Sequence, residues 1–442
     1  MSADHRQAHA YLESLLRARN QEELMRDLAP KPDNLPPRLP GGARISPETL
    51  DARWELVGAS PEERKCVLDD RTNEDRDLYQ HNIENFIGTV KVPVGLAGPL
   101  RVNGLFAQGD YYVPLAATEA ALVASYSRGA QLITEAGGCT AVLLNEGVRR
   151  APGFAFRNIA EAGQFVVWTL AHRDAFVECT AGSTRHGRLV DMQVTVEGNH
   201  VYLSFEFTTG DAAGQNMVTF ATEAICGYIA QNCPVTPEYS FLETNLSGDK
   251  KASASSFMTV RGKKVSAEVS LSADLVQKRL HTTARRMTEY WRMSAIGGVL
   301  SGTIGVQGHY ANGLAALYIA CGQDAACVAE SAVGVTRLEE RDDGSLYAAV
   351  TLPNLIVGTV GGGTGLPSQQ ACLRVLGLAG AGKAQAFAEV CASLALAGEL
   401  SIIGALAAGQ FARAHRRLAR GRNSPAAPIE ERPESTEDRS SS

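Results

Sequence analysis

The stretch RLVDMQVTVEGNHVYLSFEFTTG, residues 188–210, decides the fold class. Apolar and polar residues alternate along two runs within it, which is typical of half-buried β-strands. This texture extends from about residue 152 to 241, and long Ala/Gly-rich helical segments follow further along the chain. The sequence therefore predicts an α+β protein in which a small α+β domain, residues 152–241, is inserted into a large helical domain of residues 84–151 and 242–420.

The two ends of the chain differ from this central part. Residues 8–27 carry apolar side chains at helical spacing, the connector APKPDNLPPRLPGG (29–42) breaks regular structure, and residues 43–80 are charged and helical in character. We expect a small helical N-terminal region, residues 1–83. The segment 421–442 has too few apolar residues to form a core, so we expect it to be disordered.

Composition narrows the class of protein. The chain has 442 residues, 45% of them hydrophobic, and a formal charge of -6, which argues against nucleic acid or an anionic membrane as the main partner. Its nine cysteines form no CxxC pair and no spacing typical of a metal site, which suits a reducing cytoplasm. The N-terminus lacks a signal-peptide core, and the apolar segment 392–409 contains Glu399. We expect a cytoplasmic protein without a metal or a membrane anchor.

One glycine-rich motif resembles a phosphate-binding loop but lacks a residue that such a loop needs. GLAGAGKA (377–384) has the G-x-x-x-x-G-K spacing of a phosphate-binding loop. The position that should offer a hydroxyl to magnesium is Ala384, however. A turn between two helices is the better interpretation.

Two other glycine-rich segments favour ligand binding. VGTVGGGTG (357–365) follows a predicted strand, and TTGDAAGQNM (208–217) joins a strand end to a helix start. Consecutive glycines let the backbone approach a ligand closely, and a helix start can receive a phosphate. Each segment alone is equally compatible with an ordinary turn.

Charged residues occur where apolar or small ones are expected. Asp324 interrupts an apolar stripe on a predicted helix, 312–331, which predicts a buried carboxylate with a cationic partner such as lysine. Glu119 follows a candidate N-cap, Thr118, and could simply complement the helix dipole. The loop TNLSGDKKASASS (244–256) carries Asp249, Lys250 and Lys251, and a solvated turn is its plain alternative.

Seven segments in order resemble the 3-hydroxy-3-methylglutaryl-CoA reductase family. They are ENFIGTVKVPVGLAGPL, ATEAALVAS, TTGDAAGQNM, DKK, IACGQDAA, GTVGGGTGLPSQQACL and LAGELSIIGALAAG, and the match spans roughly residues 80–420. The chain looks more like the class I enzymes of eukaryotes and archaea than the class II form. The resemblance implies reduction of HMG-CoA to mevalonate with NADPH, a large substrate-binding domain, a small inserted NADPH-binding domain, and a homodimer or homotetramer with active sites between subunits.

The resemblance also implies four catalytic residues. Lys250 would stabilise the negative charge that develops on the carbonyl oxygen at each hydride addition. Glu119 would supply the proton that the alkoxide needs, and Asp324 would tie Lys250 and Glu119 together. His415, in GQFARAHRRLARG, would protonate the departing CoA thiolate.

Substrate and cofactor contacts are implied in the same way. The substrate-binding residues by resemblance are Arg150, Asp249, Lys251, Arg292, Asn312 and Ser125. The cofactor-binding residues are Thr184, Arg185, Asp211, Gly214, Asn216, Met217, Gly361 and Gly362, among which Arg185 and Thr184 suit the 2′-phosphate of NADPH.

Glu243 departs from the family pattern, because relatives commonly place a small hydroxyl residue there, against the substrate. An added carboxylate would repel the acid end of the substrate, so we expect that Glu243 either turns away or changes how the substrate is held. Two other functions share the fold: an NAD-dependent enzyme running in the oxidative direction, which Arg185 disfavours, and a catalytically inactive CoA-binding protein, which the four catalytic residues disfavour.

Overall fold

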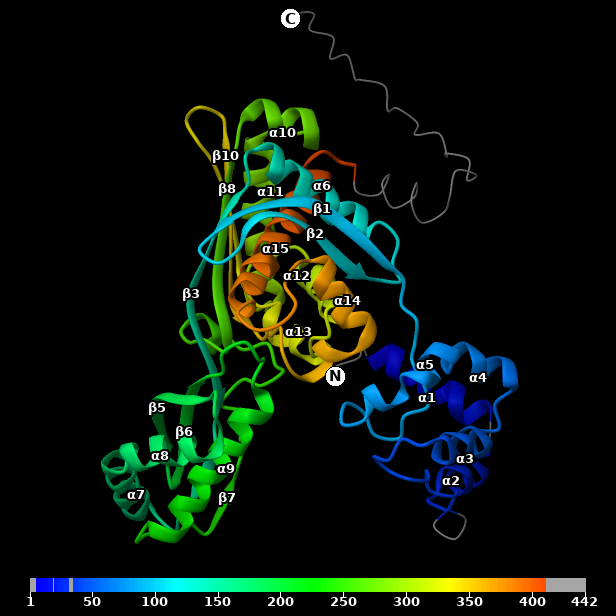
Figure 1. Ribbon diagram of the computed structural model, residues 1–442, viewed down its shortest axis with the longest axis vertical. Helices are drawn as coiled ribbons and strands as arrows, with labels where there is room; N and C mark the ends of the chain where they lie inside the picture. Colours follow the sequence, from blue (N-terminus) through cyan, green and yellow to red (C-terminus); the bar gives the residue numbers. More distant parts are fainter. Residues whose placement is uncertain (1–4, 19, 32–34, 411–442) are drawn as a thin grey trace, which may run out of the picture. The chain divides into compact units, whose positions relative to one another are not determined.

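The computed structural model describes residues 5–18, 20–31 and 35–410. These residues form two compact units, of which one ends at Thr89 and the other begins at Val90 (Figure 1). The predicted tail and His415 lie outside the described residues.

The first unit is helical. Its elements are α1 (His5–Ala18), α2 (Gln21–Leu28), α3 (Pro47–Val57), α4 (Pro61–Val67), α5 (Asp70–Glu74) and the 3-10 turn η1 (Arg76–Tyr79). Ser46 and Ser60 each form a capping box in front of a proline, which explains where α3 and α4 begin. The buried guanidinium of Arg53 donates to four carbonyl oxygens, from Pro40, Gly42, Arg44 and Phe86, and so holds the irregular segments of this unit.

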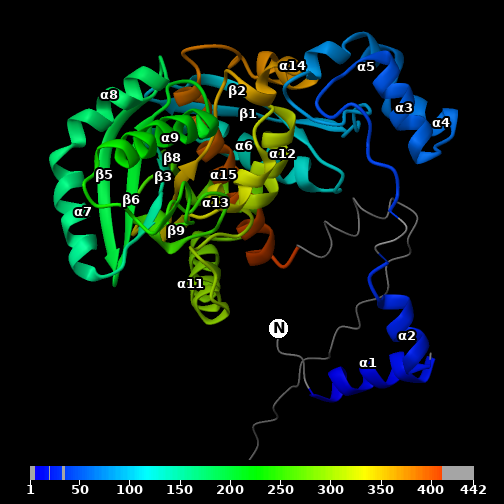
Figure 2. The ribbon, with the colours of Figure 1, turned by 90° about the horizontal axis from the view of Figure 1, so that it is seen from below.

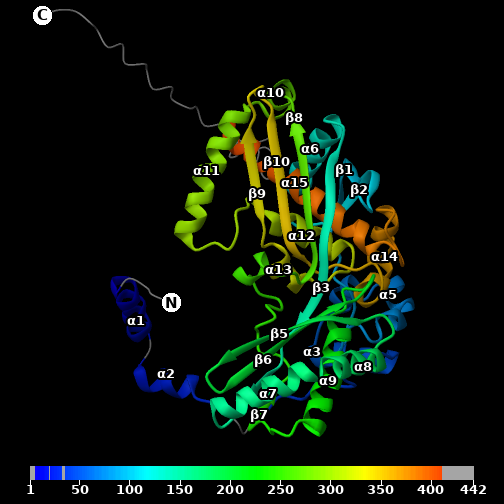
Figure 3. The ribbon, with the colours of Figure 1, turned by 90° about the vertical axis from the view of Figure 1, so that its left-hand side faces the viewer.

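The second unit is built on a ten-stranded sheet. Its strands are β1 (Val94–Gly104), β2 (Gln108–Ala116), β3 (Cys139–Arg150), β4 (Gly153–Ala155), β5 (Arg188–Glu197), β6 (His200–Thr208), β7 (Tyr239–Phe241), β8 (Gly262–Leu271), β9 (Val335–Glu340) and β10 (Leu346–Leu355). The order β7-β4-β6-β3-β8-β10-β9 has the β1–β2 hairpin beside β3, and β5 beside β6 (Figure 3). The long strand β3 is central: its first part pairs with β1 and β8, and its last three residues, 148–150, pair with β6.

Helices pack against this sheet around two separate hydrophobic cores. They are α6 (Leu122–Glu135), α7 (Ile159–Ala171), α8 (Arg173–Ser183), α9 (Gln215–Asn232), α10 (Ala273–Leu280), α11 (Ala284–Ser301), α12 (Tyr310–Ala320), α13 (Val328–Ser331), α14 (Pro367–Val375) and α15 (Ala384–Ala407), with 3-10 turns η2 (Ala254–Phe257), η3 (Ala325–Cys327) and η4 (Gly362–Gly365). One core surrounds α15; the other draws its buried side chains from residues 148–229, where α7, α8 and α9 lie beside β5 and β6 (Figure 2).

The segment that opened the sequence analysis forms two strands, β5 and β6, which pair antiparallel with Glu197 opposite His200. Alternate side chains of β6 are buried in the second core. The prediction of a protein of mixed helix and sheet is therefore confirmed.

Helix α15 is a core helix. Protein surrounds it on all sides, so most of its side chains are apolar. It is the only helix of the described ranges that is long and apolar enough to cross a membrane, and 89% of its apolar window is buried inside the protein. Two buried carboxylates on it organise loops. Glu389 accepts hydrogen bonds from the N–H groups of Leu105, Phe106, Ala107 and Leu143, and Glu399 accepts from Gly308, His309 and Thr336.

Two predicted helices are wrong in their bounds. Helix α6 begins only at Leu122, after Ala121 with a φ of 75°, so Thr118 is not its N-cap and Glu119 precedes the helix. Helix α12 ends at Ala320 instead of continuing to 331, because Gly322 takes a φ of 68° and reverses the chain. A Cβ on Gly322 would lie 2.3 Å from the carbonyl oxygen of Gly363, so only glycine permits this close turn.

Candidate active site

A cavity of about 540 Å³ in the second unit brings together the loops that the sequence analysis singled out. Its lining comes from the start of α9, the DKK loop, the turn after α12 and the glycine-rich loop after β10. The lining residues are Ala212–Met217, Lys250, Ile319, Gly322–Asp324, Gly358, Val360–Thr364, Leu366 and Gln369.

Lys250 and Asp324 form an ion pair in this cavity. Lys250 Nζ lies 2.9 Å from Asp324 Oδ2, and the two side chains are 43% and 41% exposed. The hydrogen bond that Lys250 donates to Asp324 is the largest of the influences that raise the pKa of Lys250. The predicted pairing of Asp324 is therefore present, but its predicted burial is wrong, because the apolar stripe ends with α12. Asp324 instead caps η3, where its Oδ1 accepts from the N–H of Ala326.

The backbone presents Lys250 in a constrained conformation. Lys250 has a φ of 57°, and Asn245 and Gly248 in the same loop have φ values of 65° and 74°. The left-handed region costs a residue with a side chain about 1–2 kcal/mol. The Lys250 N–H donates to Glu330 Oε1 at 3.2 Å, and this contact helps to hold the residue in that conformation.

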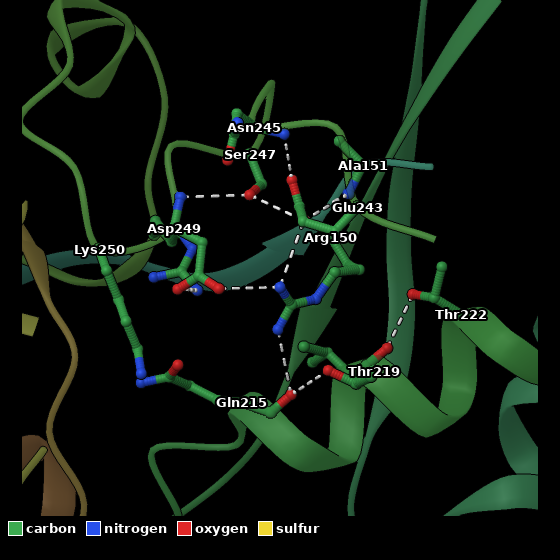
Figure 4. Close-up of polar contacts among 12 residues, drawn as sticks. Arg150, Ala151, Gln215, Thr219, Thr222, Glu243, Asn245, Ser247, Asp249 and Lys250 are labelled. Carbon is green, nitrogen blue, oxygen red and sulfur yellow. Dashed lines mark hydrogen bonds and ion pairs between the residues drawn. The ribbon is translucent and has the colours of Figure 1, made fainter. Parts of the chain in front are cut away.

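Next to Lys250, side chains of alternating charge contact one another in series. Arg150, the last residue of β3, donates from Nη1 to Asp249 Oδ2 at 2.9 Å and to Glu243 Oε2 at 3.2 Å (Figure 4). Asp249 Oδ1 also accepts from Arg261 Nη2 at 2.7 Å. Burial is the largest influence on the pKa of Asp249 and opposes ionisation, but Arg261 and Arg150 outweigh it and hold this pKa below its usual range.

This series of alternating charges ends in a fully buried ion pair. Arg261 Nη1 lies 2.5 Å from each carboxylate oxygen of Glu330, and the two side chains are 2% and 0% exposed. Burial, the largest influence, raises the pKa of Glu330 although the Arg261 guanidinium opposes it. The pairing of Gly262 with Gly147 brings the start of β8, directly after Arg261, close to the end of β3 that carries Arg150, whereas Glu330 comes from α13.

The glycine-rich loop and the start of α9 supply backbone amides to the cavity. Gly361 and Gly362 have φ values of 75° and 53°, and a Cβ on either would meet no atom of the described residues within 4 Å. Gly214, with a φ of 77°, begins α9, whose first residues include Asn216 and Met217. These five predicted cofactor residues all line the cavity.

Asp211, predicted to bind the cofactor, has its carboxylate bound by a loop of its own chain. Its carboxylate accepts hydrogen bonds from the N–H groups of Gly382, Lys383 and Ala384, at 2.7–3.1 Å. Burial is the largest influence on the pKa of Asp211 and opposes ionisation, but these three hydrogen bonds outweigh it and lower this pKa. The loop that imitates a phosphate-binding motif in the sequence therefore binds an anion of its own chain at the start of α15.

We expect Asp211→Ala to destabilise the protein by about 1–2 kcal/mol, the usual cost of losing a helix cap. Chemical denaturation measures the change. Asp343→Ala is the control, because Asp343 caps only an exposed turn, through Ser345. Equal losses in the two variants would contradict this role of Asp211.

Several predicted residues are not among those that line the cavity around Lys250 and Asp324. Glu119 is exposed, and among the described residues no hydrogen bond or ion pair joins it to Lys250 or Asp324. Arg292 on α11 and Asn312 on α12 are exposed, and Ser125 on α6 hydrogen-bonds Ser401 on α15.

The remaining predicted residues lie on loops. Arg185 is exposed beside Thr184, whose hydroxyl accepts from the N–H groups of His186 and Gly187. Lys251 is also exposed, and its Nζ donates to the backbone carbonyl of Asp249 at 2.9 Å.

Sequence reasoning missed Arg261, Glu330 and Gln323. Glu330 interrupts the apolar run CVAESAV, the same signal that drew attention to Asp324. Gln323 Oε1 accepts from the Gly358 N–H at 2.8 Å and thereby positions the glycine-rich loop. Nothing in the sequence distinguishes Arg261 from other arginines near a strand start.

Comparison with known proteins gives one consistent answer. Residues 49–420 match the family model of hydroxymethylglutaryl-coenzyme A reductase. The 3-hydroxy-3-methylglutaryl-coenzyme A reductase of Aeropyrum pernix is 45% identical over 352 residues, which cover 78% of this chain and 83% of that protein. The reductase of Methanothermobacter thermautotrophicus is 44% identical over 381 residues, covering 85% and 94%.

A solved structure shows the same fold. The class II 3-hydroxy-3-methylglutaryl-CoA reductase of Streptococcus pneumoniae, bound to NADPH in open conformations, superposes with a TM-score of 0.61 at 20% identity, covering 82% of this chain and 97% of the other. With the family model matched across most of the sequence, this chain belongs to the hydroxymethylglutaryl-coenzyme A reductase family.

Proposed function

We propose that this protein reduces HMG-CoA to mevalonate and CoA, consuming two NADPH and two protons and releasing two NADP⁺. The observation that carries the proposal is the Lys250–Asp324 ion pair in a cavity lined by glycine-rich backbone, in a chain of this family. Purified protein with HMG-CoA should oxidise NADPH, which is followed by absorbance. Absence of oxidation that depends on HMG-CoA would contradict the proposal.

The residues at the cavity fit a dinucleotide cofactor. Open space above Gly361 and Gly362, and the first turn of α9 after Gly214, leave room for a ligand to approach backbone N–H groups. Two molecules of NADPH, bound one after the other, would each supply one hydride to the same carbon, first as the thioester carbonyl and then as the aldehyde. Asn216 and Met217 would contact it from α9, and Thr184 with Arg185 would receive the 2′-phosphate. Asp211 would contribute through the loop that it fixes, since its carboxylate is already bound.

Lys250 would carry the electrostatic part of the reaction. Each carbonyl reduction places negative charge on the oxygen, and a fixed ammonium beside it lowers the barrier. Because Asp324 raises the pKa of Lys250, the amine is a cation throughout the neutral range. Asp324 also fixes the direction of the flexible side chain, with 2.9 Å between the charged atoms.

The other proposed roles follow the family resemblance. Glu119 would donate the proton to the alkoxide, and His415, outside the described residues, would protonate the CoA thiolate. Arg150, Asp249, Lys251, Arg292, Asn312 and Ser125 would bind the substrate. The proposed division into a helical region 1–83, a large domain 84–151 and 242–420, and an inserted domain 152–241 would place NADPH on the inserted part. The nine cysteines are free thiols, which is compatible with the cytoplasm as the proposed location.

We further propose a homodimer or homotetramer with active sites between subunits. Helix α11 exposes four apolar side chains, Met293, Ile296, Val299 and Leu300, at 64–83% of their full area. Contiguous exposed apolar surface of this kind is typical of an interface. Glu119 is also not among the residues that line the cavity around Lys250, which fits a site completed by a second copy. Sedimentation velocity measures the mass, and a monomer at assay concentration would contradict the assembly.

Arg185→Ala is expected to raise KM for NADPH by tenfold or more and to leave KM for NADH almost unchanged, since only NADPH carries the 2′-phosphate. Steady-state kinetics with both cofactors measure the difference. Arg157→Ala is the control, because Arg157 is also exposed but pairs with Glu161 on α7. Equal losses with the two cofactors would assign Arg185 to the fold.

A further inference from the structure

A single guanidinium nitrogen of Arg150 donates hydrogen bonds to two carboxylates of the same protein. Nη1 donates both to Asp249 Oδ2, at 2.9 Å, and to Glu243 Oε2, at 3.2 Å. Nη2 donates to the carbonyl oxygen of Gln215, a residue of the cavity lining, at 3.4 Å. The Arg150 side chain is only 8% exposed. Both N–H groups of Nη1 are therefore taken, whereas two of the five donors, the Nε–H and one N–H of Nη2, have no acceptor among the described residues.

Glu243 is fixed in this position. Its Oε2 also accepts from the N–H of Ala151 at 3.3 Å and from the hydroxyl of Ser247 at 3.0 Å, and its Oε1 accepts from the N–H of Asn245 at 2.7 Å (Figure 4). Three donors besides Arg150, two backbone N–H groups and one hydroxyl, thus hold the carboxylate, so it does not turn away from the arginine. Of the two outcomes expected from the sequence, the altered grip on the substrate is the one that this geometry supports.

The carboxylate of Glu243 makes the net formal charge of this cluster negative. The cations Arg150, Arg261 and Lys250 face the carboxylates of Glu243, Asp249, Glu330 and Asp324, and four against three leaves a formal charge of -1. A neutral residue at position 243 would leave the cluster with no net charge and Nη1 with one acceptor fewer. The Glu243 carboxylate repels an incoming carboxylate, and a neutral residue at this position would not.

We infer that Glu243 is a specificity-determining residue that weakens the hold of the site on acyl groups ending in a carboxylate. It acts through Arg150, as a positioning residue, by occupying the guanidinium donor that such a group would use. The inference rests on the proposed function, which makes Arg150 a substrate contact. Substrate and product both end in a carboxylate, so Glu243 weakens the binding of HMG-CoA and of mevalonate together and leaves CoA unaffected.

Glu243→Gln and Glu243→Ser test this inference in the full chain. We expect KM for HMG-CoA and the inhibition constant of mevalonate to fall about tenfold, the size of one screened charge interaction at close range. The inhibition constant of CoA and KM for NADPH should stay the same. Glu206→Gln is the matched control: it also removes a carboxylate from an arginine, Arg149, with side chains 11% and 13% exposed, and should change none of these constants.

A substitution that only damaged the loop around Glu243 would raise KM for HMG-CoA or lower kcat. The inference instead requires that HMG-CoA and mevalonate bind more tightly. Unchanged or raised KM for HMG-CoA in the two folded variants overturns it, and so does an equal fall in the inhibition constant of CoA. Failure of both variants to fold would also overturn it, by showing that the carboxylate serves the loop alone. An inactive wild-type protein would instead contradict the proposed function.

Discussion

Lys250→Ala is expected to lower kcat for HMG-CoA by about 100-fold to 1,000-fold, the usual loss when one donor to a developing oxyanion is removed. Arg150 and Arg261 do not replace the ammonium at that point, because both are already bound to carboxylates. Following NADPH oxidation at saturating substrate measures the change.

Stability separates a catalytic loss from unfolding. The Lys250 and Asp324 side chains are 43% and 41% exposed, and exposed pairs contribute about 0–1 kcal/mol. The variant should therefore melt close to the wild type. Lys251→Ala is the control, because Lys251 contacts only the carbonyl of Asp249 in this loop. It should mainly raise KM for HMG-CoA. Retention of kcat in Lys250→Ala, or an equal loss in Lys251→Ala, would remove Lys250 from its proposed role.

The raised pKa of Lys250 also fixes the pH range in which the pair contributes. A lysine whose folded pKa lies above its unfolded value adds stability below the unfolded value, about 10.5, and loses it as pH rises through the folded pKa. Activity near neutral pH should therefore not follow the titration of Lys250. Asp249, whose pKa is lowered, contributes stability above the unfolded value, near 3.8, and loses it as pH falls through the folded pKa.

The sequence predicted those parts of the site that depend on local pattern. The alternation of apolar and polar residues predicted β5 and β6. The consecutive glycines predicted the ligand-binding loop around Gly361, which lines the cavity. The pairing of Asp324 was predicted for the wrong reason. Helical spacing alone could not show that Gly322 ends the helix, because the constraint is a carbonyl of Gly363, distant in the sequence.

The charge chain behind Lys250 could not be predicted, because it is made by tertiary pairing. Arg261, just before β8, meets Asp249 of the preceding loop and Glu330 of α13, which is 69 residues further along the chain. Glu243 could be recognised as unusual, yet its partner Arg150 comes from a strand about ninety residues earlier in the chain. Local rules report that a charge is out of place, whereas the fold determines which partner it finds.

Glu330→Leu is expected to destabilise the protein by about 3–5 kcal/mol, because it leaves the buried Arg261 guanidinium without its main partner. Arg261 is 2% exposed, so water does not replace the lost carboxylate. Chemical denaturation measures the change. Glu289→Leu is the control, since it removes a glutamate from Arg285 on the exposed face of α11, where the pair is 74% and 55% exposed, and should cost about 1 kcal/mol or less.

A second substitution separates stability from positioning. Replacing both members of a buried pair with apolar residues often restores stability, so Arg261→Met combined with Glu330→Leu should recover much of the loss. It should not recover kcat. The Lys250 N–H would still lack its acceptor, Glu330 Oε1, and Asp249 would keep only Arg150. The φ of 57° at Lys250 is unfavourable for a lysine, so a loop without these contacts relaxes away from the conformation that aims the ammonium into the cavity. Recovery of kcat together with stability would mean that the buried pair supports the fold alone; a stable double variant with low kcat would show that Glu330 positions Lys250.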